Sequence, residues 1–129
     1  MDTTKIIEFA EKAENYGQLE DYVASGIAVE PDCQDELEIR INTKRDLVTE
    51  ISYMITESAC TPAKACASLA TMLAKNKPVL EAYLIDADRI SNEFGGLTKE
   101  NYHCAQMAEL ALKRAILDYS RFKKNQQTD

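Results

Sequence analysis

Residues 35–55 decide the fold, and they read DELEIRINTKRDLVTEISYMI. Apolar and charged side chains alternate over residues 35–41, so that one face carries Leu37, Ile39 and Ile41. A period of two is typical of a strand with one buried face. The polar residues 42–46 then predict a turn.

Residues 47–55 predict a second strand, because they are rich in β-forming side chains. The pattern places four apolar side chains on one face of it: Leu47, Ile51, Tyr53 and Ile55. A turn as short as residues 42–46 can join only antiparallel strands. The quoted stretch therefore predicts an antiparallel pair.

Further elements precede this pair. Residues 23–30 form a weaker strand candidate that contains Gly26. Before it, residues 3–16 show an apolar stripe of helical period, with Thr3 or Thr4 as the cap and Gly17 as the end. Since the connections between the three strand candidates are short, we expect an antiparallel meander.

The remainder of the chain predicts helices. Thr61 as N-cap and Pro62 at the first helical position open one over residues 61–76. A short helix over residues 79–84 follows, another over residues 87–94 ends at Gly95-Gly96, and a long one spans residues 102–124. We therefore expect an α+β fold with a three-stranded antiparallel sheet packed by about five helices, in a single domain of residues 1–129.

The net charge of the chain is −7, and its charged residues are unevenly distributed along the sequence. Residues 1–50 hold 13 acids and 5 bases, whereas residues 51–129 hold 9 acids and 10 bases. An acidic front half argues against nucleic acid as a partner. It suits a basic protein partner, although solubility alone is the favoured explanation of the acidic residues.

The sequence also argues against a membrane or secreted location. Met1 to Thr4 lack a signal peptide's basic and apolar regions, and no apolar run approaches the length of a membrane span. We therefore expect a cytoplasmic protein. In that reducing compartment its cysteines would be thiols or metal ligands rather than disulfides.

Three of the four cysteines fall at the ends of predicted elements, where side chains can converge. Cys33 precedes the alternating strand, Cys60 lies between the last strand and a helix, and Cys104 opens the last helix directly after His103, the only histidine. Cys66 lies inside a helix beside apolar neighbours, which favours a packing role.

Thiolates with an imidazole or a carboxylate suit zinc or an iron–sulfur cluster. Asp35 and His103 are the natural candidates for the fourth ligand. The chain has no C-x-x-C motif, however, and free cysteines often only fill space. The residues alone therefore leave a metal site and a packing role open. The sequence contains neither a P-loop nor a G-x-G-x-x-G motif for nucleotide binding, and no G-x-S-x-G motif of a hydrolase. We therefore do not expect an enzyme.

Several segments together resemble the NifU/IscU-type scaffolds of iron–sulfur cluster assembly. Residues 31–35 (PDCQD) resemble the Cys-Gly-Asp region of that family, and residues 59–69 resemble its Gly-Cys segment and the helix after it. Residues 75–82 resemble the next helix junction, and residues 103–119, beginning His-Cys-Ala-Gln-Met-Ala, resemble its His-Cys helix. The resemblance runs from about residue 15 to the last helix.

The resemblance implies a SufE/NifU-like fold and a site for a transient [2Fe–2S] cluster. The implied ligands are three cysteines and two neighbouring groups: Cys33, Asp35, Cys60, His103 and Cys104. The implied partners are a cysteine desulfurase that donates sulfur and apo-proteins that accept the finished cluster. Members of that family can also hold zinc at the same ligands, and a zinc-binding sulfur acceptor is the alternative function.

The sequence departs from the family pattern at informative positions. Gln34 and Ala59 stand where the family has glycine, so a positive φ at either would be strained. Residues 97–101 (LTKEN) replace the Leu-Pro-Pro-Val-Lys segment that binds a dedicated Hsp70 chaperone in some members, and we do not expect that chaperone as a partner. The altered glycines also leave open an interaction module without metal.

Overall fold

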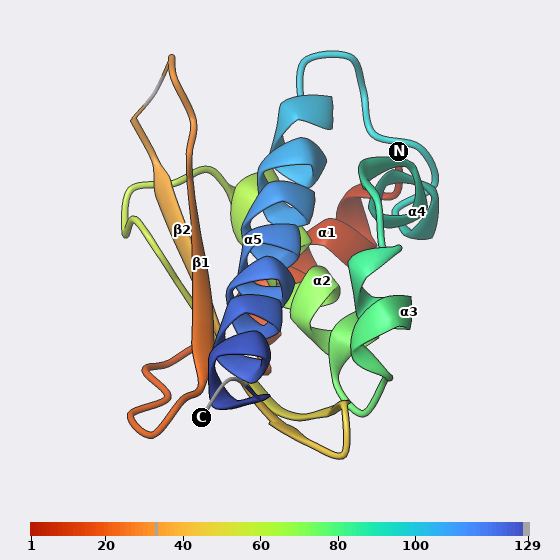
Figure 1. Cartoon of the computed structure of the whole chain (residues 1–129). Helices are drawn as coiled ribbons and strands as arrows, with labels where there is room; N and C mark the ends of the chain where they lie inside the picture. The colour runs from red at the N-terminus through yellow and green to blue at the C-terminus, as the bar shows by residue number, and fades with distance from the viewer. Residues whose placement is uncertain (33, 128–129) are drawn as a thin grey trace.

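The computed structural model describes residues 1–32 and 34–127. A three-stranded sheet occupies one side of the molecule, and helices cover one of its faces (Figure 1). The elements follow the order α1 (Thr3–Lys12), β1 (Ala24–Val29), β2 (Glu36–Lys44), β3 (Leu47–Ile55), α2 (Thr61–Ala74), α3 (Val79–Tyr83), α4 (Ala87–Glu93) and α5 (Tyr102–Gln127). The predicted α+β class and antiparallel meander are confirmed, with strand order β1-β2-β3.

The turn between β2 and β3 is tighter than the sequence predicts. Thr43 pairs with Val48 and Lys44 with Leu47, so the strands continue through residues 42–44. Only Arg45 and Asp46 form the turn, with φ values of 55° and 62°. Two successive positive φ values match the right-handed twist of a hairpin, which is why the connection needs only two residues.

The predicted core face of β3 is wrong at Leu47, because the pairing of β2 with β3 shifts in register between Asn42 and Thr43. The extra residue in β3 breaks the alternation, as a β-bulge does. As a result Val48 is fully buried, whereas Leu47 is only half-buried. The assignment of Ile51, Tyr53 and Ile55 to the core face is confirmed.

Helix α1 ends earlier than predicted, at Lys12. Ala13 takes φ 44°, and its N–H bonds the Phe9 carbonyl, so the left-handed cap sits at Ala13 rather than Gly17. Residues after the cap run along the free edge of β3. There the Tyr53 N–H donates to the Asn15 carbonyl, and the Gly17 N–H donates to the Tyr53 carbonyl, each at 3.0 Å.

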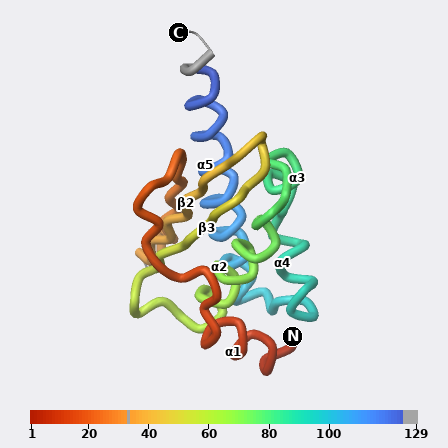
Figure 2. The backbone as a smooth tube through the Cα atoms, turned by 90° about the horizontal axis from the view of Figure 1, so that it is seen from below, coloured from red at the N-terminus to blue at the C-terminus, as the bar shows by residue number. Residues whose placement is uncertain are grey.

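Helix α5 packs directly on β1, and it projects beyond the sheet at its C-terminal end (Figure 2). The helix face toward the sheet carries small side chains, including Ala108, Ala111 and Ala115, all buried. Gly26 lies beneath it. A Cβ on Gly26 would come within 2.2 Å of the Ala111 carbonyl oxygen, so only glycine permits this close approach.

Side chains of α5 also cover the outer edge of β1. The Ser25 N–H donates to Asp118 Oδ2 at 3.0 Å, and Arg114 Nη1 donates to the Ile27 carbonyl at 2.6 Å. These bonds satisfy backbone groups that an edge strand would otherwise offer to another chain.

Candidate functional site

Cys60 lies at the start of α2, after the loop that leaves β3. Its carbonyl accepts a helical hydrogen bond from the Lys64 N–H at 3.1 Å, so Cys60 is the N-cap of α2. The predicted cap at Thr61 is wrong by one residue, because helical bonding already begins at Cys60. The exposed Cys60 side chain stands at the helix end that attracts anionic groups.

Cys104 and His103 reach the same corner from the first turn of α5. Cys104 is only 1% exposed, and its Sγ lies 3.9 Å from Cys60 Sγ and 3.7 Å from His103 Nε2. His103 is exposed. The thiols of Cys60 and Cys104, which are far apart in the chain, and the imidazole of His103 therefore gather at the boundary between α2, α5 and solvent. We call this place the sulfur corner.

Asp35 lies at the end of the sheet from which the Cys60 loop departs. It is 9% exposed, and its carbonyl accepts a hydrogen bond from the Glu30 N–H at 2.8 Å. The next residue, Glu36, donates its N–H to Thr56 Oγ1 at 2.8 Å. Thr56 opens the loop to Cys60, so the backbone fixes Asp35 beside the base of that loop.

Cys33, the third cysteine that the sequence places in the site, lies outside the described residues. Within the parts of the chain that the structure describes, no three histidine, cysteine or acidic side chains are arranged to hold a metal ion. The structure thus brings together Cys60, His103 and Cys104 and puts Asp35 at the same end of the sheet.

Gln34 has a φ of 63°, in the left-handed region. The positive φ for which strain was expected is therefore present at Gln34, and its energetic cost stays a prediction. The Gln34 side chain partly compensates, because its Nε2 donates to the Pro31 carbonyl at 2.9 Å. Ala59, the other altered glycine, is buried and has no positive φ, so the same concern does not apply there.

Cys66 is fully buried in α2, in agreement with its predicted packing role. Burial, reinforced by the charge of nearby Cys60, raises the pKa of the Cys66 thiol to about 12. A thiol with that pKa stays protonated at neutral pH and is a poor nucleophile or metal ligand.

Sequence reasoning missed the role of Lys64. This residue follows Cys60 by one helical turn, and its Nζ donates to the Glu57 carbonyl at 2.8 Å. The bond ties the first turn of α2 to the loop that carries Cys60. The position of Lys64, four residues after Cys60, was visible in the sequence. Only the path of the loop decided that the Glu57 carbonyl would accept its hydrogen bond.

A family model described as "NifU-like N terminal domain" matches residues 1–126. The chain belongs to this NifU-like N-terminal domain family. Among its relatives is the iron–sulfur cluster assembly scaffold protein IscU 1 of Archaeoglobus fulgidus, which is 35% identical over 129 residues, covering 100% of this chain and 82% of the relative. The IscU scaffold protein of Azotobacter vinelandii is 31% identical over 122 residues, covering 92% of this chain and 94% of the relative.

Two solved structures share the fold of this chain. A putative scaffold for the SUF system from Fervidobacterium islandicum aligns with a TM-score of 0.71 at 14% identity, covering 88% of this chain and 95% of that one. A NifU-like N-terminal protein from Brucella abortus aligns with a TM-score of 0.66 at 18% identity, covering 92% and 94%. Among the described residues of this family member, no helix has the length and apolar character needed to cross a bilayer.

Proposed function

We propose that this chain is a scaffold for iron–sulfur cluster assembly, which builds a transient [2Fe–2S] cluster and passes it to apo-proteins. The observation that carries the proposal is the Cys60–Cys104 sulfur pair, 3.9 Å apart with the His103 imidazole alongside. Sulfur and imidazole ligands are those that iron–sulfur clusters use. Relatives with the same domain are named as scaffolds of this assembly.

In this proposal Cys33, Asp35, Cys60, His103 and Cys104 supply the ligands for the cluster. The cluster is the cargo of the scaffold, so it must be held and then released. A carboxylate such as Asp35 binds iron less firmly than a thiolate does, which favours release. The loop position and exposure of Cys60 keep that ligand accessible to solvent and to partners.

The proposed sulfur donor is a cysteine desulfurase that carries a persulfide. A thiolate of the scaffold attacks the terminal sulfur of that persulfide, the S–S bond breaks, and the desulfurase cysteine leaves as a thiolate. Cys60 is suited to this step because it is exposed, whereas Cys104 is 1% exposed. Reduction of the transferred sulfur to sulfide then requires electrons from an external reductant.

Anaerobic reconstitution with ferrous iron, L-cysteine, a desulfurase and an added reductant tests the function. We expect visible charge-transfer absorption from the wild-type protein, and its loss in Cys60→Ala and Cys104→Ala. Cys66→Ala is the matched control, because Cys66 is a buried thiol of the same helix as the Cys60 cap, and this variant should keep the absorption. A spectrum that persists when Cys33, Cys60 and Cys104 are all replaced by alanine would overturn the proposal.

A zinc-binding sulfur acceptor is the second candidate, and the same sulfur and imidazole groups favour it, since structural zinc sites use them too. Metal and acid-labile sulfide analysis of anaerobically purified protein separates the two. Zinc without sulfide, together with stimulation of the desulfurase, supports the acceptor; iron with sulfide supports the scaffold. We place either activity in the cytoplasm, without the dedicated Hsp70 partner.

A further inference from the structure

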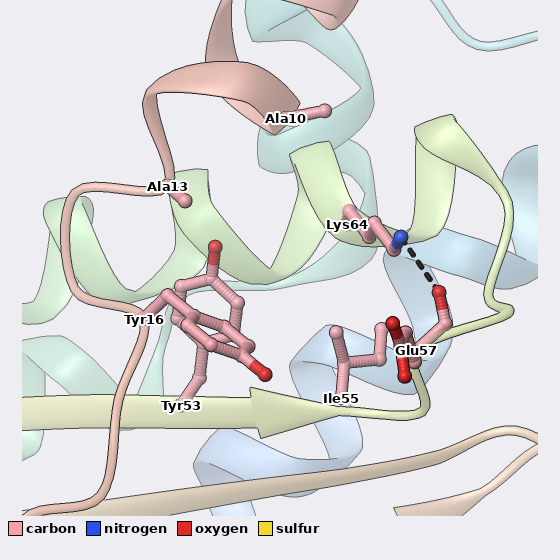
Figure 3. Close-up of a pocket in the computed structure, with 7 residues that line it drawn as sticks. All are labelled: Ala10, Ala13, Tyr16, Tyr53, Ile55, Glu57 and Lys64. Atoms are coloured by element: carbon pink, nitrogen blue, oxygen red, sulfur yellow. Dashed lines mark hydrogen bonds between the residues drawn. The ribbon is translucent and has the colours of Figure 1, made fainter.

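A cavity of about 180 Å³ opens between the end of α1, the end of β3 and the first turns of α2. Figure 3 shows Ala10 and Ala13 above it, the rings of Tyr16 and Tyr53 on one side, and Lys64 with Glu57 on the other. The two rings meet edge to face with their centroids 5.5 Å apart. The cavity walls are therefore mostly apolar and aromatic.

One positive and one negative side chain complete the cavity. The Lys64 ammonium is held in place by its bond to the Glu57 carbonyl, and this uses one of its N–H donors. The Glu57 carboxylate is exposed. Across the described part of the chain, neither side chain takes part in an ion pair, so each keeps its charge available to a ligand.

A small zwitterion complements this arrangement. A free amino acid carries a carboxylate and an ammonium on one carbon, whereas an internal residue of a peptide carries neither. Cavities for small molecules combine apolar walls with a few polar groups that fix the orientation of the ligand, which is the combination found here. The volume is below that of a pocket for a drug-sized ligand and suits a molecule of amino-acid size.

We propose that this cavity binds a free amino acid with an apolar side chain. The ligand's carboxylate pairs with Lys64, its ammonium pairs with Glu57, and its side chain lies against Ala10, Ala13 and the Tyr16 ring. The site is separate from the sulfur corner, because Cys60, His103 and Cys104 do not line the cavity. The proposal therefore stands independently of cluster assembly.

Titration of the ¹⁵N-labelled, cluster-free protein with L-leucine tests the site by NMR. We expect saturable shifts of amides around the cavity, with a Kd in the millimolar range that is ordinary for so small a ligand. N-acetyl-L-leucine lacks the ammonium, L-leucine methyl ester lacks the carboxylate, and glycine lacks the apolar side chain. Each should bind at least about fivefold more weakly than L-leucine, because each loses one of the three contacts.

Substitutions in the cavity test which side chain contacts which group of the ligand. Lys64→Met keeps most of the apolar stem and should weaken L-leucine binding about tenfold while leaving the affinity for the methyl ester unchanged. Glu57→Gln should weaken L-leucine binding and leave that of N-acetyl-L-leucine unchanged. Tyr16→Ala should weaken all the leucine ligands. Tyr22→Ala is the matched control, since Tyr22 is a similarly exposed tyrosine whose ring lies on Arg40, outside the cavity.

Three results would overturn the proposal. The first is the absence of saturable shifts in a protein whose spectrum shows it to be folded. The second is equal binding of L-leucine, its acetyl derivative and its methyl ester. The third is unchanged affinity in Lys64→Met, with the spectrum of that variant showing a native fold.

Discussion

At the scale of single residues, conformation and burial distinguish positions that look alike in the sequence. Gln34 occupies a left-handed conformation that its side chain does not favour. Cys60 and Cys66 lie six residues apart in one segment, yet one thiol is exposed and the other is fully buried. Each contrast has a direct experimental consequence.

Gln34→Gly should stabilise the protein by about 1 kcal/mol, because glycine removes the Cβ that makes φ 63° unfavourable. Urea unfolding followed by circular dichroism measures the change. Gln34→Ala is the control, since it loses the same side-chain hydrogen bond but keeps a Cβ. Equal stability of the glycine and alanine variants would show that the conformation at residue 34 costs nothing.

Alkylation with iodoacetamide at pH 8 should label Cys60 quickly and Cys66 only after unfolding. Burial keeps the reagent from Cys66 and raises its pKa to about 12, so little thiolate forms there. Peptide mass spectrometry after timed quenching measures both rates. Labelling of Cys66 at a rate close to that of Cys60 in the native protein would contradict the packing role.

At the scale of elements, α5 organises the molecule. Its small residues let β1 approach closely, its Asp118 and Arg114 bond the outer edge of β1, and its N-terminal turn delivers Cys104 to the sulfur corner. Near its other end, Lys123 bonds Asp46 in the turn between β2 and β3. The position of the site therefore depends on how firmly α5 lies on the sheet.

Gly26→Ala should destabilise the fold by about 3 kcal/mol, because the new Cβ would press on backbone atoms of α5 that cannot move independently. Denaturant unfolding measures the loss. Gly96→Ala is the comparison: its Cβ would meet open space, and only its φ of 89° is unfavourable, so it should cost about 1 kcal/mol. A Gly26→Ala effect no larger than that of Gly96→Ala would rule out the close contact.

The contact between Asp46 and α5 should make stability depend on pH. Hydrogen bonds from Lys123 and Tyr119 lower the pKa of Asp46 below its ordinary 3.8. A lowered folded-state pKa gives stabilisation that is present above pH 3.8 and is lost as the pH falls through the folded-state value.

Asp46→Asn tests this dependence while keeping a residue that tolerates the left-handed turn. The variant should be less stable than the wild type at pH 7, and the difference should shrink as the pH falls below 4. Melting temperatures measured between pH 7 and pH 2 give the profile. A difference that stays constant over that range would show that the carboxylate charge plays no part.

At the scale of the whole molecule, the site joins segments that are distant in the chain. Cys60 follows β3, Cys104 opens α5, and Asp35 precedes β2, and only the assembled sheet and helices bring them to one end. A ligand that binds all of them holds the folded state together. Binding and stability should therefore be coupled.

Adding zinc to the metal-free protein should raise its melting temperature, because a metal that binds only the native arrangement stabilises that state. Differential scanning calorimetry with and without a chelator measures the shift. The increase should disappear in Cys60→Ala and remain in Cys66→Ala. The same increase in both variants would place the metal elsewhere.

The sequence by itself determined the class of fold, the strand order and the boundaries of most elements. Alternation over residues 35–41 is a local signal of burial on one face, and a cap, proline or glycine marks a helix end through its own conformational preferences. The resemblance also indicated the family, which the family model and the relatives confirm, whereas its assignment of the cysteines as ligands stays a prediction.

Only the tertiary structure decided which predicted residues meet. Spacing gave no reason for Cys60 and Cys104, 44 residues apart, to lie 3.9 Å from each other. The bulge that buries Val48, the left-handed cap at Ala13 and the bond from Lys64 to the Glu57 carbonyl were likewise not predicted from the pattern of apolar and polar residues. Periodicity reports the environment along one element, whereas contacts between elements depend on how their surfaces pack, which no single segment encodes.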